Sequence, residues 1–199
     1  MSEKPLKIVA LILAAGESRR LGKPKQLLSY NNTTLLNHVK KQFPADLVEG
    51  PFVVLGAFAK EVRLKSALNN TEVIEFDGWK EGMGSSLAYA CKQLFSKSDY
   101  DGILITLGDL PKVSQSDYRN MIALFHAPGD IVATQVNDSI GVPALFGSDY
   151  FLELMQICGE RGAKSLLMRY KERITVYANP NAGFDIDTYS DYSNLNSNE

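Results

Sequence analysis

Cysteine, histidine and tryptophan are scarce in this chain, and their scarcity excludes several classes of protein. The 199 residues include two cysteines, two histidines and one tryptophan. Two cysteines, Cys91 and Cys158, are too few for a disulfide framework or a cysteine-rich zinc site. Because both have apolar neighbours, we expect them to be buried structural thiols. His38 and His126 lie on expected helices away from the motifs below, so we expect surface or hydrogen-bonded histidines rather than catalytic ones.

Long apolar runs and a large net charge are also missing. The first apolar run, Ile8–Ala14, is too short to span a bilayer or to form a secretion signal with its cleavage site. The formal net charge is −2, from 21 lysines and arginines against 23 aspartates and glutamates. This balance provides no basic field for a polyanion or a membrane surface. We therefore expect a cytoplasmic protein with no nucleic-acid and no membrane partner.

The charges that are present are unevenly distributed along an otherwise ordinary globular composition. A basic cluster lies between Glu17 and Lys25, and an acidic segment begins at Asp185. A chain that separates its charges in this way can hold an anion with one segment and a metal ion with the other. The length predicts one domain over residues 1–192, followed by a polar tail, 193–199, that we expect to fray.

Apolar segments typical of strands alternate with segments of helical periodicity. The expected strands are Lys7–Leu13, Pro51–Leu55, Glu72–Phe76, Gly102–Leu107, Asp130–Gln135, Val142–Phe146 and Arg173–Tyr177. The expected helices are Thr34–Phe43, Ser85–Phe95 and Gln115–Phe125, with two more inside Ser148–Ile157 and Arg161–Tyr170. This order predicts an α/β protein: a three-layer, doubly wound, mostly parallel sheet with helices on both faces. Ligands of such folds bind beyond the carboxyl ends of the strands.

The loop after the first expected strand combines small residues with cations. It reads Ala14-Ala15-Gly16-Glu17-Ser18-Arg19-Arg20-Leu21-Gly22-Lys23-Pro24-Lys25. Backbone N–H groups and cations in such a loop suit a polyphosphate. The loop is no P-loop, because five residues separate Gly16 from Gly22 and Pro24 replaces the metal-binding hydroxyl. It also lacks the dinucleotide fingerprint. A solvated basic turn is the alternative.

Carboxylates follow two other segments of the chain. The strand Gly102–Leu107 ends in Gly108-Asp109, and an aspartate at a strand's carboxyl end can bind Mg²⁺. The alternative role for Asp109 is a turn residue that caps the helix beginning near Ser114. Asp185 and Asp187 alternate along an extended segment, so both can face a metal ion. Asp187 could instead cap a last helix.

A glycine-rich segment lies between the third expected strand and the following helix. Gly82 and Gly84 permit the close approach of a ligand, and Ser85 and Ser86 offer hydroxyls and N–H groups at the expected helix start. A capped helix entry with no ligand is the alternative. For Trp79 we favour packing beneath the loop over stacking on a base.

Taken together, these motifs resemble the molybdenum cofactor nucleotidyltransferases, the MobA-like NTP transferases. The resemblance rests on the following segments: Leu13–Leu28, Gly108–Pro111, Trp79–Leu87, Gly141–Phe146, Gly159–Lys164 and Asp185–Asp191. It implies the Rossmann-like nucleotidyltransferase fold of the nucleotide-diphospho-sugar transferase type. Three positions depart from the family pattern: Glu160 replaces Asp, Lys164 replaces Arg and Tyr189 replaces Pro.

The resemblance also implies roles for particular residues. Arg20, Lys25 and Asp109 would be catalytic, and Asp109, Asp187 and Asp185 would hold the Mg²⁺ cofactor. Arg19 and Lys23 fall at variable positions and are expected to be solvated. The residues implied in nucleotide binding are Ala14, Ala15, Gly16, Ser18, Gly82, Ser86 and Gly108.

The reaction that the resemblance implies is NMP transfer from an NTP to a phosphate acceptor, with release of pyrophosphate. Ala14-Ala15-Gly16 resembles the cytidylyl branch, which favours CTP as donor and molybdopterin, in its molybdate-loaded form, as acceptor. Two alternatives remain open: a sugar- or alditol-phosphate nucleotidyltransferase, and an accessory protein that binds the cofactor without turnover.

Overall fold

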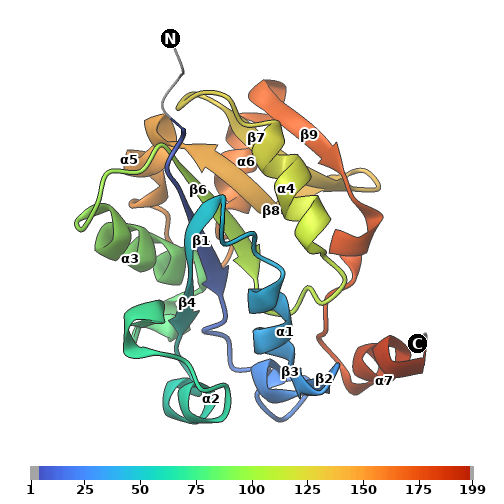
Figure 1. Cartoon of the computed structure of the whole chain (residues 1–199). Helices are drawn as coiled ribbons and strands as arrows, with labels where there is room; N and C mark the ends of the chain where they lie inside the picture. The colour runs from blue at the N-terminus through green and yellow to red at the C-terminus, as the bar shows by residue number, and fades with distance from the viewer. Residues whose placement is uncertain (1–4, 198–199) are drawn as a thin grey trace.

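One sheet of seven strands, in the order β5-β4-β1-β6-β8-β7-β9, forms the centre of the computed structural model, which describes residues 5–197 (Figure 1). The strands are β1 (Ile8–Leu13), β4 (Val48–Leu55), β5 (Val73–Glu75), β6 (Gly102–Leu107), β7 (Ile131–Val136), β8 (Ser139–Gly147) and β9 (Ile174–Ala178). Strand β8 runs antiparallel to both of its neighbours, and the other pairings are parallel. The predicted mostly parallel sheet is therefore confirmed.

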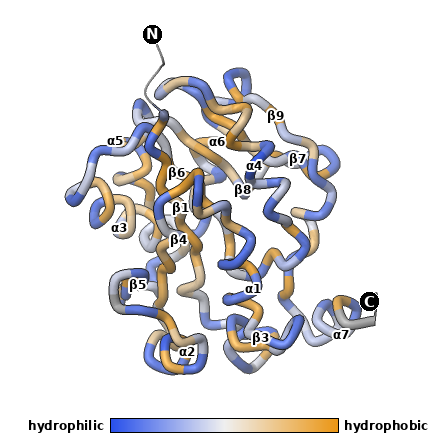
Figure 2. Tube along the Cα trace, in the orientation of Figure 1, coloured by the Kyte–Doolittle hydropathy of each residue, from blue (hydrophilic) through white to orange (hydrophobic). Residues whose placement is uncertain are grey.

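Helices cover both faces of this sheet. The helices are α1 (Leu35–Lys41), α2 (Ala59–Lys65), α3 (Met83–Phe95), α4 (Gln115–Ala123), α5 (Phe151–Leu154), α6 (Lys164–Arg169) and α7 (Tyr189–Ser197). Alternate residues of β1 enter two separate cores: Val9 and Leu11 pack with α3, α5 and α6, whereas Ile8 and Ile12 pack with α1, α2 and α4. Figure 2 shows the apolar strands between these two layers. This arrangement confirms the three-layer prediction.

The carboxyl ends of β1 and β6 lie side by side. Leu13, the last residue of β1, pairs with Leu107, the last residue of β6. The Gly108 N–H then donates to the Leu13 carbonyl at 3.0 Å, so both loops leave the sheet from one point. The first basic loop and Asp109 are thus neighbours because of strand register, although they are far apart in sequence.

The C-terminal arm, residues 184–197, crosses this edge of the sheet and ends in α7. Ile186 and Leu195 are buried in a small third core with Leu28 and Leu35. The Ile186 N–H donates to the Asp109 carbonyl at 3.2 Å, which ties the arm to the loop after β6. The prediction of a frayed tail is therefore wrong for residues 193–197, which are helical; residues 198 and 199 lie outside the described part.

Several local predictions also differ from the structure. Cys158 is exposed rather than buried, while Cys91 is buried as expected. Helix α3 begins at Met83 and follows Gly82, so Ser85 does not cap it. Thr188, not Asp187, caps α7, because its hydroxyl accepts from the Asp191 N–H at 3.2 Å. The side chains of Thr34 and Ser114 cap α1 and α4. No helix in the described part of the chain is long and apolar enough to cross a membrane.

Helix α2 and a small two-stranded hairpin were not expected. Helix α2 buries only Val62, so its apolar periodicity is weak. A two-stranded hairpin, β2 (Ser29–Tyr30) and β3 (Thr33–Thr34), turns at Asn31 and Asn32, which have φ values of 47° and 58°. Asparagine is one of the residues that tolerate this left-handed conformation, so the pair could have been recognised as a hairpin turn.

The start of α3 packs against the loop before α6, and this contact requires glycine. The Gly84 N–H donates to the Gly159 carbonyl at 2.7 Å, and a Cβ at Gly84 would lie 2.8 Å from that oxygen. We expect Gly84→Ala to lower the free energy of unfolding by about 1–3 kcal/mol, because the two segments must separate. Denaturant unfolding measures this loss. Ser85→Ala, in the same turn, serves as the control, with an expected change within about 0.5 kcal/mol; an equal loss in both variants would contradict the packing argument.

Candidate functional site

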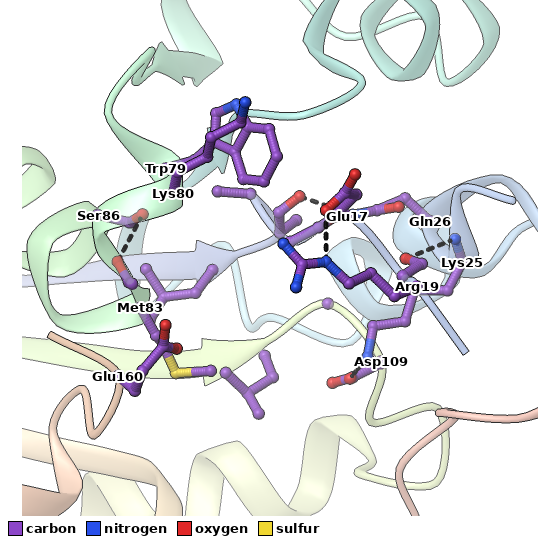
Figure 3. Close-up of a pocket in the computed structure, with 18 residues that line it drawn as sticks. Glu17, Arg19, Lys25, Gln26, Trp79, Lys80, Met83, Ser86, Asp109 and Glu160 are labelled. Carbon is purple, nitrogen blue, oxygen red and sulfur yellow. Dashed lines mark hydrogen bonds and ion pairs between the residues drawn. The ribbon is translucent and has the colours of Figure 1, made fainter. Parts of the chain in front are cut away.

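Two adjoining cavities lie at the carboxyl edge of the sheet. The first cavity has a volume of about 330 Å³ and the second a volume of about 830 Å³. Both are lined by Leu13, Met83, Leu107 and Glu160, so they share a wall. In Figure 3, Lys25 and Asp109 meet on one side of the first cavity, and Ser86, Met83 and Glu160 lie on the opposite side.

Most of the predicted nucleotide-binding and catalytic residues line the first cavity. They are Ala14, Ala15, Gly16, Ser18, Lys25, Gly82, Ser86, Gly108 and Asp109. Arg20 does not line it: this side chain is exposed and forms an ion pair with Asp187. Asp185 is exposed and lines the second cavity instead. The structure thus brings the two loops together. Asp185 lies within electrostatic reach of them, because its charge helps to raise the pKa of Asp109.

A charge cluster of Arg20, Lys25, Asp109 and Asp187 joins the first loop, the loop after β6 and the C-terminal arm. Lys25 Nζ forms an ion pair with the Asp109 carboxylate, and it lies 3.1 Å from Asp187 Oδ1. Arg20 Nη1 lies 3.0 Å from the other oxygen of Asp187. Lys25 and Asp109 are largely shielded from solvent, whereas Arg20 is exposed. The shielded pair is therefore the stronger electrostatic feature.

Burial affects the pKa values of both Lys25 and Asp109. Burial alone lowers the pKa of Lys25, but the carboxylates of Asp109 and Asp187 outweigh it and hold this pKa above its ordinary value. Burial raises the pKa of Asp109, and Lys25 offsets part of that rise. Lys25 therefore carries its positive charge throughout the physiological range. The cluster offers a fixed cation to an anion that enters the first cavity.

The first loop has a backbone conformation suited to an anion. Ser18 adopts a φ of 54°, its carbonyl accepts from the Gly22 N–H at 3.1 Å, and its hydroxyl accepts from the Lys25 N–H at 3.2 Å. Within residues 5–197, no hydrogen bond engages the backbone N–H groups of residues 15–18. Successive unpaired N–H groups form a concave anion site. The loop and Lys25 together can receive phosphate oxygens.

One oxygen of Asp109 suits a metal ion. Asp109 Oδ1 is buried and has no hydrogen-bond partner among the described residues, and hard carboxylate oxygens are the ligands that Mg²⁺ prefers. Asp187 is the second available carboxylate, on the other side of Lys25. No group of three or more His, Cys, Asp or Glu side chains in the described part of the chain is assembled to hold a metal. The predicted trio of aspartates is thus not preformed, and substrate oxygens would complete the coordination.

The glycine-rich segment forms the opposite wall. Ser86 Oγ donates to the Gly82 carbonyl at 3.3 Å and the Ser86 N–H to the same carbonyl at 3.3 Å, so this serine is engaged within its helix. Gly82 has a φ of 104° and meets the backbone of Gly159, which explains why no side chain is present there. Trp79 both lines the first cavity and packs against Gly56, so it borders the ligand space as well as the core.

Some residues of the site were not predicted, or were predicted differently. Arg19 is exposed as expected but lines the first cavity, where its Nε lies 2.7 Å from Glu17 Oε2. Lys23 is exposed and lies 5.9 Å from the ring centroids of Tyr189 and Tyr192. Gln26, which is buried and lines the first cavity, was missed altogether. Its place beside Lys25 in the first motif is the signal that could have found it.

The histidines behave as expected. His38 Nε2 lies 3.1 Å from the Pro111 carbonyl oxygen, and the His38 ring packs edge-on against Tyr30. His126 is exposed and lines neither cavity. Neither ring reaches the charge cluster through a described contact.

Fold and site together define a class: a doubly wound α/β protein with an anion-binding crevice at the carboxyl edge of its sheet. A family model described as the MobA-like NTP transferase domain matches residues 10–174. The chain belongs to this family, and the predicted resemblance is confirmed.

Solved structures agree with this assignment. The structure of Rv0371c from Mycobacterium tuberculosis H37Rv is 30% identical, with a TM-score of 0.80, and the match covers 96% of this chain and 98% of that one. A second structure of Rv0371c is a complex with manganese; it is 29% identical, has a TM-score of 0.75, and the match covers 95% and 97% of the two chains. A nucleotidyl transferase from Methanothermobacter thermautotroptrophicus, 23% identical with a TM-score of 0.81 over 96% and 97% of the chains, shares the fold.

Curated relatives match a shorter part of the chain. The bifunctional protein GlmU of Clostridium tetani is 26% identical over 140 residues, which are 69% of this chain and 30% of GlmU. The chain thus spans less than a third of the length of this relative.

Proposed function

We propose that this protein is a nucleotidyltransferase that moves NMP from an NTP to a phosphate-bearing acceptor and releases pyrophosphate. The observation that carries the proposal is the first cavity, which is lined by Lys25, Asp109 and residues 15–18, and no described hydrogen bond engages the backbone N–H groups of residues 15–18. Family membership supports the reaction class. Transfer of this kind needs no nucleophilic side chain, because the acceptor phosphate attacks the α-phosphorus in line and pyrophosphate departs.

The chain's own residues have distinct tasks in this proposal. The first loop binds the triphosphate through backbone N–H groups, and Lys25 neutralises the negative charge that develops as pyrophosphate leaves. Arg20, which is exposed beside Asp187, adds a second cation at the mouth of the cavity. Asp109 and Asp187 would hold Mg²⁺, and Asp185 would approach the ion from the side of the second cavity. When bound, the ion supplies Lewis-acid stabilisation of phosphate charge.

The second cavity suits the acceptor. Its apolar residues include Leu110, Val136 and Ala163, and the exposed cations Arg161 and Lys164 line it as well. Asp138, Glu160 and Asp185 also line this cavity. The apolar wall suits a planar organic body, and the two cations can bind a phosphate that it carries. Molybdopterin has this chemistry, and we propose it, in its molybdate-loaded form, as the acceptor. Because the cavities share Leu13 and Leu107, the acceptor phosphate and the NTP would meet above the ends of β1 and β6.

CTP is the donor we favour, with Gly82 and Ser86 bordering the nucleoside. The support is the segment Ala14-Ala15-Gly16, which resembles the cytidylyl branch of the family. A sugar- or alditol-phosphate nucleotidyltransferase is the enzymatic alternative, since such enzymes share the signature of the first loop. The non-enzymatic alternative is an accessory protein that binds the cofactor without turnover.

Pyrophosphate release tests these possibilities. The protein is incubated with Mg²⁺, each of the four common NTPs in turn, and purified molybdopterin or a sugar phosphate. We expect release with CTP and molybdopterin. We expect that release to be lost when EDTA removes the metal, because the buried Asp109 carboxylate then has no metal ion to share with the substrate. Turnover with a sugar phosphate alone would favour the enzymatic alternative. Nucleotide binding without turnover on any acceptor would favour the accessory role.

A further inference from the structure

Gln26 is a buried carboxamide directly behind the first loop. It belongs to the short 3₁₀ helix Lys25–Leu27, and its side chain is 3% exposed. Gln26 Nε2 donates to the Ala14 carbonyl at 2.7 Å and to the Gly16 carbonyl at 3.3 Å. Both acceptors are carbonyl oxygens, so the NH₂ group must be the one that faces them. Gln26 Oε1 is buried with no partner among the described residues.

These contacts fix the direction of the loop's peptide units. The Ala15 carbonyl, between the two that Gln26 holds, accepts from the Ala57 N–H at 3.1 Å. Three successive carbonyls are therefore turned toward the protein. In a planar trans peptide the C=O and the following N–H point in opposite directions. The N–H groups of residues 15 and 17 are consequently aimed away from Gln26, and the N–H group of residue 16 is aimed away from Ala57. No described hydrogen bond engages any of the three.

The loop needs such an anchor because Gly16 is open to rearrangement. A Cβ added at Gly16 would meet nothing within 4 Å, so packing does not hold this residue in place. Glycine also populates more backbone conformations than other residues. A rotated peptide on either side of Gly16 would place a carbonyl oxygen where a phosphate oxygen is expected, and the two would repel each other.

We propose that Gln26 is a positioning residue that holds the phosphate-binding N–H groups in place by binding the carbonyls of Ala14 and Gly16. This inference rests on the proposed function, because it assigns Gln26 to the binding of the triphosphate of the nucleotide. It predicts that Gln26 serves the triphosphate and not the nucleoside. Burying Gln26 Oε1 without a partner lowers the stability of the fold, and an apolar residue at this position would avoid that loss. The presence of a glutamine here therefore fits a role in ligand binding.

Binding measurements on the whole protein test the proposal. Trp79, the single tryptophan, lines the first cavity, so its fluorescence reports ligand binding without any need for turnover. The variants are Gln26→Met, which keeps the volume and removes the donor, and Gln26→Glu, which places a carboxylate against two carbonyls. The probes are CTP with Mg²⁺, inorganic tripolyphosphate with Mg²⁺, and cytidine. Ser66→Ala is the control, because Ser66 is also buried and hydrogen-bonded but lines neither cavity.

We expect Gln26→Met to weaken binding of CTP and of tripolyphosphate by a similar factor of about ten, the value of one or two lost hydrogen bonds, and to leave cytidine binding unchanged. Gln26→Glu should weaken both further, and Ser66→Ala should change none. Equal losses for all three probes would assign Gln26 a merely structural role. A loss confined to cytidine and CTP would assign it to the nucleoside, and unchanged binding would also overturn the proposal.

A measurement without ligand separates this inference from the proposed function. Amide hydrogen exchange of Ala14 and Ala57, whose N–H groups donate to the Val54 and Ala15 carbonyls, should be faster in Gln26→Met than in the wild type and unchanged in Ser66→Ala, because only the first variant frees the loop. Equal exchange in wild type and Gln26→Met would overturn the positioning role. Faster exchange in a protein that binds neither CTP nor tripolyphosphate would support the anchor and contradict the proposed function.

Discussion

Asp109→Asn is expected to reduce pyrophosphate release by at least about 10²–10³-fold, the loss typical of removing one group that stabilises transition-state charge. The substitution keeps the shape of the side chain but removes the only charged group at the buried end of the loop after β6. Asp109 Oδ1 has no hydrogen-bond partner among the described residues, and an amide oxygen can still accept from Lys25 in place of Oδ2, so the fold should tolerate the exchange. Steady-state rates with CTP and Mg²⁺ measure the loss.

Stability and metal binding distinguish this outcome from misfolding. Burial raises the pKa of Asp109, so the neutral amide should leave the midpoint of thermal unfolding unchanged or raise it. Mn²⁺ binding, followed by electron paramagnetic resonance, should weaken together with activity. Asp149→Asn is the matched control, because Asp149 is exposed and lines neither cavity. Activity near that of the wild type in Asp109→Asn would contradict the metal assignment.

The sheet was predictable because its central strands are buried on both faces. The segment Gly102–Leu107 is apolar at almost every position, and its predicted bounds match β6. Helix α2, by contrast, buries one residue and exposes Leu64, so the sequence carries too little periodicity to reveal it. The helical tail was missed for a related reason: Leu195 is buried against α1 and the first loop, and such a contact depends on tertiary structure rather than on local composition.

The site residues that could be predicted are those that belong to short, recognisable sequence motifs. Gly16 and Lys25 belong to the motif that follows β1, Asp109 belongs to the motif that follows β6, and the register of these two strands brings the motifs together. The place of Gln26 beside Lys25 could have assigned it to the site, but its role could not be predicted, because a glutamine that holds carbonyls has no characteristic spacing. The different surroundings of Asp185 and Asp187 were also hidden: alternation places both on one side of a strand, but in this irregular arm Asp187 pairs with Lys25 whereas Asp185 lines the second cavity.

The charge cluster explains how a chain with a net charge near zero can still hold charged groups together at one site. Arg20 and Lys25 both pair with Asp187, and Lys25 pairs with Asp109 as well. Opposite charges from distant parts of the sequence thus neutralise one another at one edge of the sheet. When a triphosphate and a divalent cation enter, the phosphate oxygens can pair with the two cations and the metal ion with the two carboxylates, so that no buried charge is left unpaired.

Lys25→Met tests this balance, and we expect it to lower kcat/KM by about 10²–10³-fold and the free energy of unfolding by about 3 kcal/mol. Catalysis suffers because the cation that faces the departing pyrophosphate is lost. Stability suffers because the Asp109 carboxylate stays buried without its partner. Pyrophosphate release measures the first effect and denaturant unfolding the second. Lys23→Met, which removes an exposed cation of the same loop, should change kcat/KM less than threefold.

The double variant Lys25→Met/Asp109→Asn decides whether the two effects have one origin. Once both charges are absent, no buried carboxylate is left unpaired, so the free energy of unfolding should return to within about 1 kcal/mol of the wild-type value. Activity should stay as low as in either single variant, because residues that act as a unit are not additive in catalysis. A double variant whose stability loss equals the sum of the single losses would show that Lys25 and Asp109 are not coupled, and the charge cluster would then not be the anion site.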